Sequence, residues 1–349
     1  MSLFFTLLVV AAGFYLTVRI GNWLSLITGN NCLPLTGLII LLLSGMLMVA
    51  SPHNLVAENR FRTYVVGLSA FCGIYLLMGW LLMDLVSFIF SMDAKVKGWI
   101  PVILCIVCAA AGMIQTGRIA VVPYTVSGMG IRKRIILLSD LHIGYYVGSR
   151  HIRKVVSKVN SLDGDLIVIA GDMINDGNTL ECPEIRETEV LLSSMKSAEG
   201  TYACTGNHDP LADDEEFMKF LDRSGIRLLQ DEAVEVNGLQ VVGRNTEIYP
   251  RKSIEQLHLK EMKTLLIDHD PCGINEAVQQ GIDVVVCGHT HRGQLFPFQL
   301  FTRLVYKKWQ NYGLAVHGKT TSIVSSGAGF FSMPMRLGSR CEVVVIDMQ

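Results

Sequence analysis

Charged residues are almost absent from the first third of this 349-residue chain, and this imbalance limits its folding more than any other feature. Residues 1–122 contain six Lys or Arg and three acidic residues, whereas the remainder contains 24 basic and 28 acidic residues. The first part suits a lipid bilayer, and the mildly acidic second part suits a folded domain in water. Because the chain lacks the basic excess that nucleic-acid binding needs, we expect no nucleic-acid partner.

Four apolar stretches in the first part are about as long as a helix that crosses a bilayer, which takes about 20 residues. The first has neither a basic start nor a clear cleavage site, so we interpret it as a span rather than a signal peptide. The sequence therefore predicts a transmembrane domain over residues 1–122, in contact with the lipid bilayer. Its four helices are expected at about 2–20, 33–50, 63–85 and 98–118.

An even number of spans would place both ends of the chain on the same side of the membrane. Because cytoplasmic loops are enriched in Lys and Arg, the side with more basic residues is expected to be the cytoplasm. The side of the termini would carry Arg60, Arg62, Arg118, Arg132, Lys133 and Arg134, and the other side would carry Arg19, Lys95 and Lys97. We therefore predict a multi-pass protein whose second domain is cytoplasmic.

The nine cysteines are scattered along the chain, and their one Cys-x-x-Cys pair, Cys105 and Cys108, lies within a predicted span. No spacing among them is typical of a zinc knuckle or of a disulfide framework. We interpret them as buried thiols in a reducing compartment, which also favours a cytoplasmic second domain.

Five short apolar runs in residues 124–349 are each followed at once by Asp, Asn or His. Such runs predict buried strands, and sites in open α/β sheets are built at the carboxyl ends of strands. The polar groups are Asp140 and His142 after 135–138, Asp172 after 166–170, Asn207, His208 and Asp209 after 201–205, His269 after 264–267, and His289 and His291 after 284–287.

Each of these motifs alone is more often a hydrogen-bonded surface pair than a set of ligands. Together they bring many carboxylates and imidazoles to strand ends, where such groups would repel or stay unpaired unless cations held them. A metal centre resolves this conflict. Mixed imidazole, carboxylate and amide ligands suit manganese, iron or zinc rather than calcium.

The order of the motifs is more specific than any one of them. SDLHIG, GD, GNHD, a lone histidine after an apolar strand, and GHTH follow one another up to His291. This set resembles the calcineurin-like metallophosphoesterase superfamily. The segment 326–329, followed by Pro334 and Arg336, is similar to the membrane-associated YkuE-like branch. The resemblance implies an α/β fold over residues 124–349, a two-sheet β-sandwich flanked by helices, preceded by the four-helix transmembrane domain.

The resemblance also implies two divalent metal ions about 3.5 Å apart, manganese before iron or zinc, and in-line attack by a metal-bridging hydroxide. His208 would protonate the leaving oxygen, and Asp209 would orient the ring of His208. By motif, Asp140, His142 and His291 would hold the first metal, Asn207, His269 and His289 the second, and Asp172 would bridge both.

The sequence departs from the YkuE-like pattern at two places. Asn175 stands where that branch commonly has an acid, and Asp176 follows it, which leaves the role of Asp176 open. Arg292 replaces a common glycine and could grip a second phosphate or a carboxylate, or could be a solvated loop residue. Arg292 and Arg336 are our candidates for contacts with substrate.

Residues 295–309 mix four Phe or Trp residues with Arg and Lys close behind His291. Aromatic and cationic side chains gather in the headgroup layer of membranes, so we interpret this segment as a lip on the bilayer. A core helix with one cationic face is the alternative.

The favoured hypothesis is a membrane-anchored hydrolase that cleaves a phosphate ester or pyrophosphate bond of a lipid-linked substrate. A phosphodiesterase for soluble nucleotides, with the spans as a simple anchor, is the second hypothesis. The third is a receptor or scaffold whose metal site has lost catalysis. The complete ligand set and His208 argue against the third, because a degenerate site usually loses some of these residues.

Overall fold

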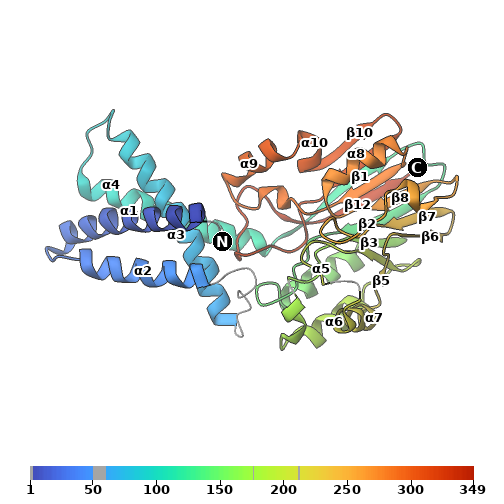
Figure 1. Cartoon of the computed structure of the whole chain (residues 1–349), viewed down its shortest axis with the longest axis horizontal. Helices are drawn as coiled ribbons and strands as arrows, with labels where there is room; N and C mark the ends of the chain where they lie inside the picture. Colours follow the sequence, from blue (N-terminus) through green and yellow to red (C-terminus); the bar gives the residue numbers. More distant parts are fainter. Residues whose placement is uncertain (1–2, 50–59, 176, 211–212) are drawn as a thin grey trace. The chain divides into compact units, whose positions relative to one another are not determined.

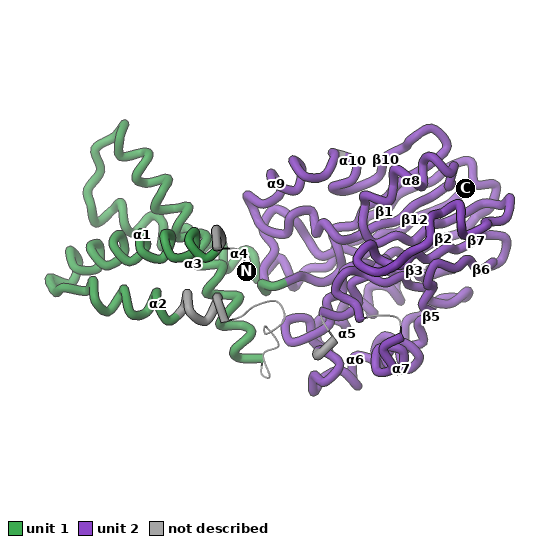
Figure 2. Tube along the Cα trace, viewed as in Figure 1, with its two compact units in different colours: residues 1–113, 332–334 green, residues 114–331, 335–349 purple. Residues whose placement is uncertain are grey.

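The computed structural model describes residues 3–49, 60–175, 177–210 and 213–349. The chain divides into two compact units, residues 1–113 with 332–334 and residues 114–331 with 335–349 (Figure 2). Unit 1 is helical, and unit 2 contains all the strands of the described chain (Figure 1).

Unit 1 consists of four helices, α1 (Leu3–Thr28), α2 (Leu33–Val49), α3 (Arg60–Val86) and α4 (Ala94–Thr116). Among the described residues, only the stretches within α1, α3 and α4 are long and apolar enough to cross a membrane. The prediction of a fourth span at 33–50 is therefore wrong. Helix α2 has 17 residues, so it is about 25 Å long, shorter than the roughly 30 Å hydrocarbon layer.

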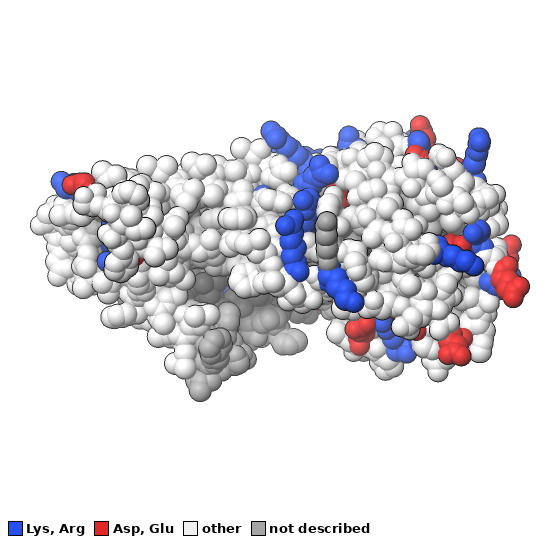
Figure 3. Space-filling model, turned by 90° about the horizontal axis from the view of Figure 1, so that it is seen from above, with Lys and Arg blue, Asp and Glu red and all other residues white. Residues whose placement is uncertain are grey.

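Small residues let the helices of unit 1 approach each other closely. Gly21 of α1 faces Leu33 at the start of α2, and Gly37 of α2 faces Thr17 of α1, so the two helices are antiparallel. Such small-residue contacts are typical of helices that pack in lipid. On the face of unit 1 that Figure 3 shows, charged side chains are few.

The few charges inside unit 1 are paired. Asp84 near the end of α3 accepts a hydrogen bond of 2.6 Å from the Tyr15 hydroxyl and lies 2.7 Å from Lys97 Nζ. It also forms an ion pair with Arg19 of α1. Pairing lowers the cost of placing such groups among apolar helices.

Unit 2 contains two mixed six-stranded sheets flanked by helices, which confirms the predicted α/β sandwich. The first sheet has the order β1 (Ile119–Val126), β12 (Cys341–Met348), β2 (Lys133–Leu138), β3 (Leu166–Ala170), β4 (Thr201–Cys204) and β5 (Arg227–Leu228). The second has the order β10 (Gly313–His317), β11 (Thr320–Val324), β9 (Val284–Cys287), β8 (Thr264–Ile267), β7 (Leu239–Gly243) and β6 (Glu232–Val236).

The strands bury both faces, because alternate residues point to opposite sides. Ile135 and Leu137 of β2 pack with residues of the second sheet such as Leu265. Ile136 and Leu138 pack against the helix layer of α5 (Ser149–Asn160), α6 (Ile185–Ser193) and α7 (Glu215–Arg223). Helices α8 (Ile274–Gln279), α9 (Phe298–Val305) and α10 (Lys308–Asn311) lie on the other side of the sandwich (Figure 1).

The five strands that precede the polar motifs belong to two parallel sets, although β2 is also paired antiparallel with β12. β2, β3 and β4 form one parallel set, and β7, β8 and β9 form another. Parallel strands end at the same edge, so each set brings its motifs together.

Candidate metal centre

The backbone turns sharply where the strands end. Five of the seven predicted metal ligands lie in the left-handed region, with φ between 46° and 70°. Non-glycine residues rarely adopt this conformation, and it costs on the order of 1–3 kcal/mol each. The turn lets consecutive side chains of one loop point inward rather than to opposite sides. The five residues are Asp140, His142, Asp172, His289 and His291.

The first group of ligands comprises Asp140, His142 and His291. The Nε2 atoms of the two histidines are 3.0 Å apart, and Nε2 of His291 is 3.4 Å from Oδ1 of Asp140. All three residues are buried and offer atoms close enough together to hold one cation. Two facing imidazole nitrogens and a carboxylate are a donor set that a divalent cation fits.

The second group comprises Asn207, His269 and His289. Oδ1 of Asn207 is 2.7 Å from Nδ1 of His289 and 3.1 Å from Nε2 of His269. These two ring nitrogens are 3.2 Å apart. The amide oxygen and two imidazole nitrogens thus converge on one point.

Asp172 lies between the two groups. Its Oδ2 is 3.5 Å from Nε2 of His142 and 3.3 Å from Nε2 of His269, one member of each group. Asp140, Asp172 and His269 form a second buried triad that could hold a cation, beside the triad of Asp140, His142 and His291. Two adjacent triads that share a carboxylate are consistent with a dinuclear metal site.

The electrostatics of the cluster favour cations. Burial raises the pKa of Asp140 to about 6 and lowers the pKa of His142 to about 3. Burial opposes the charge of Asp172 and of His269, but their mutual attraction holds the pKa of Asp172 well below its usual range and raises that of His269 to about 10. With its pKa raised, the His269 ring carries a proton on Nε2 at neutral pH. A cation that binds at this nitrogen must displace that proton, so metal binding should release protons.

Nδ1 of His142 is buried and has no hydrogen-bond partner among the described residues. A neutral imidazole carries a proton on only one nitrogen, and its other nitrogen can accept a hydrogen bond or bind a metal. An unpaired ring nitrogen in the interior is costly, so hydrogen bonds do not explain why this ring is buried. Its Nε2 lies 3.0 Å from Nε2 of His291 and 3.5 Å from Oδ2 of Asp172, a donor set that a cation fits. The residues present therefore fit a bound metal.

Two glycines make room for the carboxylates. A Cβ on Gly206 would collide with Oδ1 of Asp172, and a Cβ on Gly288 would collide with Oδ2 of Asp140. The glycines of the GNHD and GHTH motifs thus keep the ligand side chains within reach of one another.

The ring of His208 is oriented differently from the expectation. Among the described residues, the hydrogen bonds of the Asp209 carboxylate go to the backbone and not to this ring. This buried carboxylate accepts hydrogen bonds from the backbone N–H groups of Met173, Ile174 and Gly206, at 2.8–3.1 Å. Nδ1 of His208 instead lies 2.9 Å from the backbone oxygen of Asn175. Asp209 follows His208 in sequence, but the loop turns between them and the two side chains point in different directions. The Asp209 carboxylate therefore stabilises the loops that carry Asp172 and Asn207.

Arg336 is fully buried rather than available to a substrate. Its guanidinium donates to the backbone oxygens of Ser326 and Gly329, each at 2.7 Å, and its Nη2 lies 3.2 Å from Nδ1 of His291. This placement favours a structural role beside His291 over the expected substrate contact.

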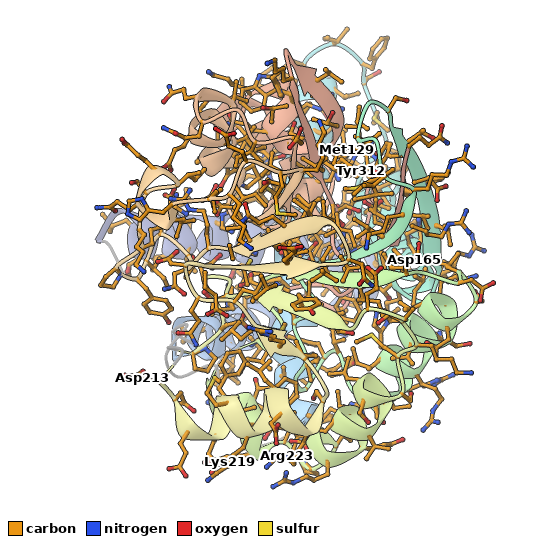
Figure 4. All side chains as sticks on the ribbon, turned by 90° about the vertical axis from the view of Figure 1, so that its right-hand side faces the viewer. Met129, Asp165, Asp213, Lys219, Arg223 and Tyr312 are labelled. Atoms are coloured by element: carbon orange, nitrogen blue, oxygen red, sulfur yellow. The ribbon has the colours of Figure 1, made fainter. Side chains whose placement is uncertain are left out.

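The guanidinium of Arg292 lies 4.4 Å from the ring centre of Tyr312 and is partly exposed. Tyr312 lies within the body of unit 2 (Figure 4), so the aromatic ring holds the guanidinium while part of the arginine still faces solvent. Asp176 lies outside the described residues.

Sequence reasoning missed two residues beside the cluster, Phe331 and Asn175. The ring of Phe331 lies 4.6 Å from that of His208 and 5.2 Å from that of His142. Phe331 directly follows the segment 326–329, which could have drawn attention to it. Asn175 contributes through its backbone oxygen, which any residue would supply, so its identity gives no signal.

We predict that the purified chain binds close to two equivalents of divalent metal and that Asp172→Asn lowers this to one equivalent or fewer. Removing the negative charge that lies between the two ligand groups weakens the binding of a cation by each group. Elemental analysis after removal of excess metal measures the content.

The matched control is Asp213→Asn, because Asp213 is exposed and lies at the outer edge of unit 2 (Figure 4). It should keep two equivalents. One equivalent or none in active wild-type protein would contradict the dinuclear site.

Comparison with known proteins supports this chemistry. The family model of the calcineurin-like phosphoesterases matches residues 133–293. An uncharacterized metallophosphoesterase of Helicobacter pylori is 31% identical over 228 residues, which cover 62% of this chain and 59% of that protein. A Danio rerio protein described as a transmembrane protein with metallophosphoesterase domain is 31% identical over 237 residues, 62% of this chain and 53% of its own.

An uncharacterized metallophosphoesterase of Aquifex aeolicus is 27% identical over 262 residues, 70% of this chain and 98% of that protein. The chain spans between about half and three fifths of the Helicobacter and Danio proteins. Unit 1 contributes three stretches that are long and apolar enough to cross a membrane. The segment that carries the candidate metal ligands is thus similar in sequence to the calcineurin-like phosphoesterases, and its Asp and His residues could hold metal ions.

Proposed function

We propose that this chain is a membrane-anchored hydrolase that cleaves a phosphate ester or pyrophosphate bond of a lipid-linked substrate. The observation that carries the proposal is the combination of His208 and the two ligand groups with an exposed apolar helix, α9, in the same unit. We further propose that residues 1–122 are the membrane domain, that 124–349 are the catalytic domain, and that the chain belongs to the YkuE-like branch.

In this proposal the ligands act as their positions imply. When bound, two divalent cations, manganese before iron or zinc, supply an acidified water and neutralise charge on the phosphate. Asp140, His142 and His291 hold one cation, Asn207, His269 and His289 hold the other, and Asp172 serves both. Arg292 contacts a second anionic group of the substrate.

His208 serves as the acid for the leaving oxygen. Its Nδ1 lies 2.9 Å from the backbone oxygen of Asn175, so the proton of the neutral ring stays on Nδ1. Nε2 is then the atom that takes up a proton and delivers it to the departing alcohol. The backbone N–H of His208 donates to Oδ1 of Asp172 at 2.8 Å, which ties the acid to the bridging ligand.

The lipid part of the proposal rests on α9. Five apolar residues in or next to this helix are between 53% and 82% exposed, which is unusual for so many large side chains in one place. The helix has no acidic residue, and Arg303 and Lys307 are exposed beside the apolar face. The five residues are Phe296, Leu300, Phe301, Leu304 and Val305.

The predicted lip is thus carried by a different set of side chains from the one expected. Phe296 and Phe301 are exposed, but Phe298 is partly buried, and Trp309 packs against the core cluster around α8. At the end of α9, the ring of Tyr306 lies 6.1 Å from that of His289. An acyl chain that follows α9 would therefore arrive at the metal ligands. In Figure 3, Lys and Arg side chains gather on the face that carries this helix.

A phosphodiesterase for soluble nucleotides is the second candidate, because Arg292 and the metal ligands need no lipid. It leaves the exposed face of α9 without a function. A scaffold without catalysis is disfavoured by the complete ligand set together with His208.

We propose that the catalytic unit faces the cytoplasm. The charges at the ends of the α3–α4 hairpin support this orientation, and they do not depend on how many spans precede the hairpin. Arg60 and Arg62 at the start of α3 and Arg118 after α4 share the side of the catalytic unit, and Lys95 and Lys97 lie at the turn between the helices. Three basic residues against two favour this orientation. Lys133 and Arg134 are left out of this comparison because both belong to β2.

We predict that His208→Ala keeps its metal but loses about 10²–10⁴-fold in kcat. An aryl phosphodiester has a good leaving group and should be affected less than an alkyl diester. Steady-state kinetics with both substrates and elemental analysis measure these effects. The exposed residue His258 offers the control His258→Ala, which should behave as wild type. Loss of metal, or an equal loss on both substrates, would refute the role of His208.

We predict that a cysteine at position 319 is shielded from an impermeant thiol reagent in intact cells, whereas a cysteine at position 91 is labelled. Lys319 is exposed on the catalytic unit, and Ser91 is exposed in the turn between α3 and α4. Both variants should be made in a Cys272→Ser background, because Cys272 is an exposed cysteine. Labelling at 319 but not at 91 would reverse the orientation.

We predict that Phe301→Ser with Leu304→Ser raises the apparent KM for a lipid phosphate at least tenfold and leaves a small soluble phosphodiester almost unaffected. Each apolar side chain contributes about 1.5–3 kcal/mol when it leaves water, and each cation near an anionic surface about 1 kcal/mol. Kinetics in nanodiscs with both substrates test this.

The control is Val190→Ser with Met218→Ser, which changes exposed apolar residues on α6 and α7. A parallel loss on both substrates in the α9 variant would mean that the helix supports the fold and not the lipid.

A further inference from the structure

Phe331 lies beside the histidines of the metal centre although it is not a ligand. Its ring centre is 4.6 Å from that of His208, 5.2 Å from that of His142 and 6.4 Å from that of His291. The preceding residue, Phe330, is only 5% exposed and packs in the core. Phe331 is 37% exposed, so the two neighbouring rings are divided between the core and the site.

Gln294 holds Phe331 in place through the backbone. Its Nε2 donates to the Phe331 oxygen, and its Oε1 accepts from the Phe331 N–H, both at 2.8 Å. The Gln294 backbone has φ +47° and its oxygen accepts from Leu337 N–H at 3.0 Å and Ser339 Oγ at 2.8 Å. We call this pair of hydrogen bonds between Gln294 and Phe331 the clamp. Gln294 is only three residues after His291, so the clamp fixes the position of Phe331 relative to the metal ligands.

More than a third of the Phe331 surface stays in contact with solvent, next to polar imidazoles. A fully buried ring would remove more apolar surface from water, yet the paired hydrogen bonds from Gln294 hold Phe331 at this edge of the site. Of the three nearby histidines, His208 is closest, and it is the residue assigned to the leaving oxygen. An apolar group attached to that oxygen would be next to the Phe331 ring.

We propose that Phe331 forms one wall of the leaving-group subsite and packs against the apolar body of the departing alcohol, and that Gln294 is its positioning residue. This inference rests on the proposed function, because it uses the role of His208. It makes alcohols with an aromatic or aliphatic body next to the ester oxygen the preferred leaving groups. Phe331 is thus a specificity-determining residue, whereas the metal ligands do not distinguish one alcohol from another by its apolar part.

Phosphonates test this without turnover, because the phosphonate group is common and the apolar body varies. Calorimetry on the metal-loaded full chain in detergent should show that wild type binds phenylphosphonate more tightly than methylphosphonate. Phe331→Ala should reduce that preference by about three- to tenfold. Methylphosphonate affinity, inorganic phosphate affinity and metal content should stay unchanged. Phe331→Trp should keep the preference, and Val190→Ala, on exposed α6, is the control for lost apolar surface.

Gln294→Leu supplies a second, independent test of the clamp. It keeps the size of the side chain and removes both hydrogen bonds, so it should weaken the phenyl preference in the same direction. Combined with Phe331→Ala it should cause no further loss, because the two residues act as one unit. Additive losses would show that Gln294 acts by another route and would overturn its assignment.

Two results would overturn the role of Phe331. One is a wild-type chain that binds both phosphonates equally, and the other is a Phe331→Ala variant whose preference equals that of wild type. Failure of the proposed hydrolysis looks different. In that case no diester is turned over, while the phenyl preference and its loss in Phe331→Ala persist in the binding measurement.

Discussion

The carboxylate of Asp172 connects the parts of the catalytic unit. Its Oδ2 faces one imidazole of each ligand group, and its Oδ1 accepts the backbone N–H of His208. A single buried negative charge thus joins both groups and the proposed acid. Its attraction to His269 also opposes the cost of burying the charge, which explains why the pKa of Asp172 stays far below its usual range.

The arrangement of the two sheets brings Asp172 close to His269. The Asp172 loop follows β3 in one sheet, and the His269 loop follows β8 in the other, so the bridge joins the two sheets at one edge. Residues with a left-handed backbone conformation turn the loops inward, and Gly206 leaves space for the Asp172 carboxylate. The backbone strain of the site is tolerated because dense packing of apolar strands below it fixes the loop ends.

Much of this could be predicted from the sequence. Each apolar run that is followed by Asp, Asn or His forms a strand in the structure. The family resemblance, which the order of the motifs carries, implied the two-sheet sandwich. The direction of individual side chains could not be predicted. Asp209 follows His208 but binds three backbone N–H groups of the loops, because adjacency in sequence says nothing about which way a turn points its residues.

The remaining differences have similar causes. Arg336 has the charge of a substrate-binding residue, but the fold buries it against carbonyl groups. Phe331 reaches the histidines through a loop that carries no motif. Helix α2 is apolar like the other three, but its length of 17 residues distinguishes it, and hydropathy alone cannot show where a helix ends.

The position of Asp172 between two metal ions is the central claim to be tested. Anomalous diffraction from crystals of the manganese-loaded full chain tests it most directly. We predict two anomalous peaks on either side of the Asp172 carboxylate, one within ligand distance of His142 and His291 and the other within ligand distance of Asn207 and His269. A single peak, or a second peak that Asp172 does not touch, would contradict the claim.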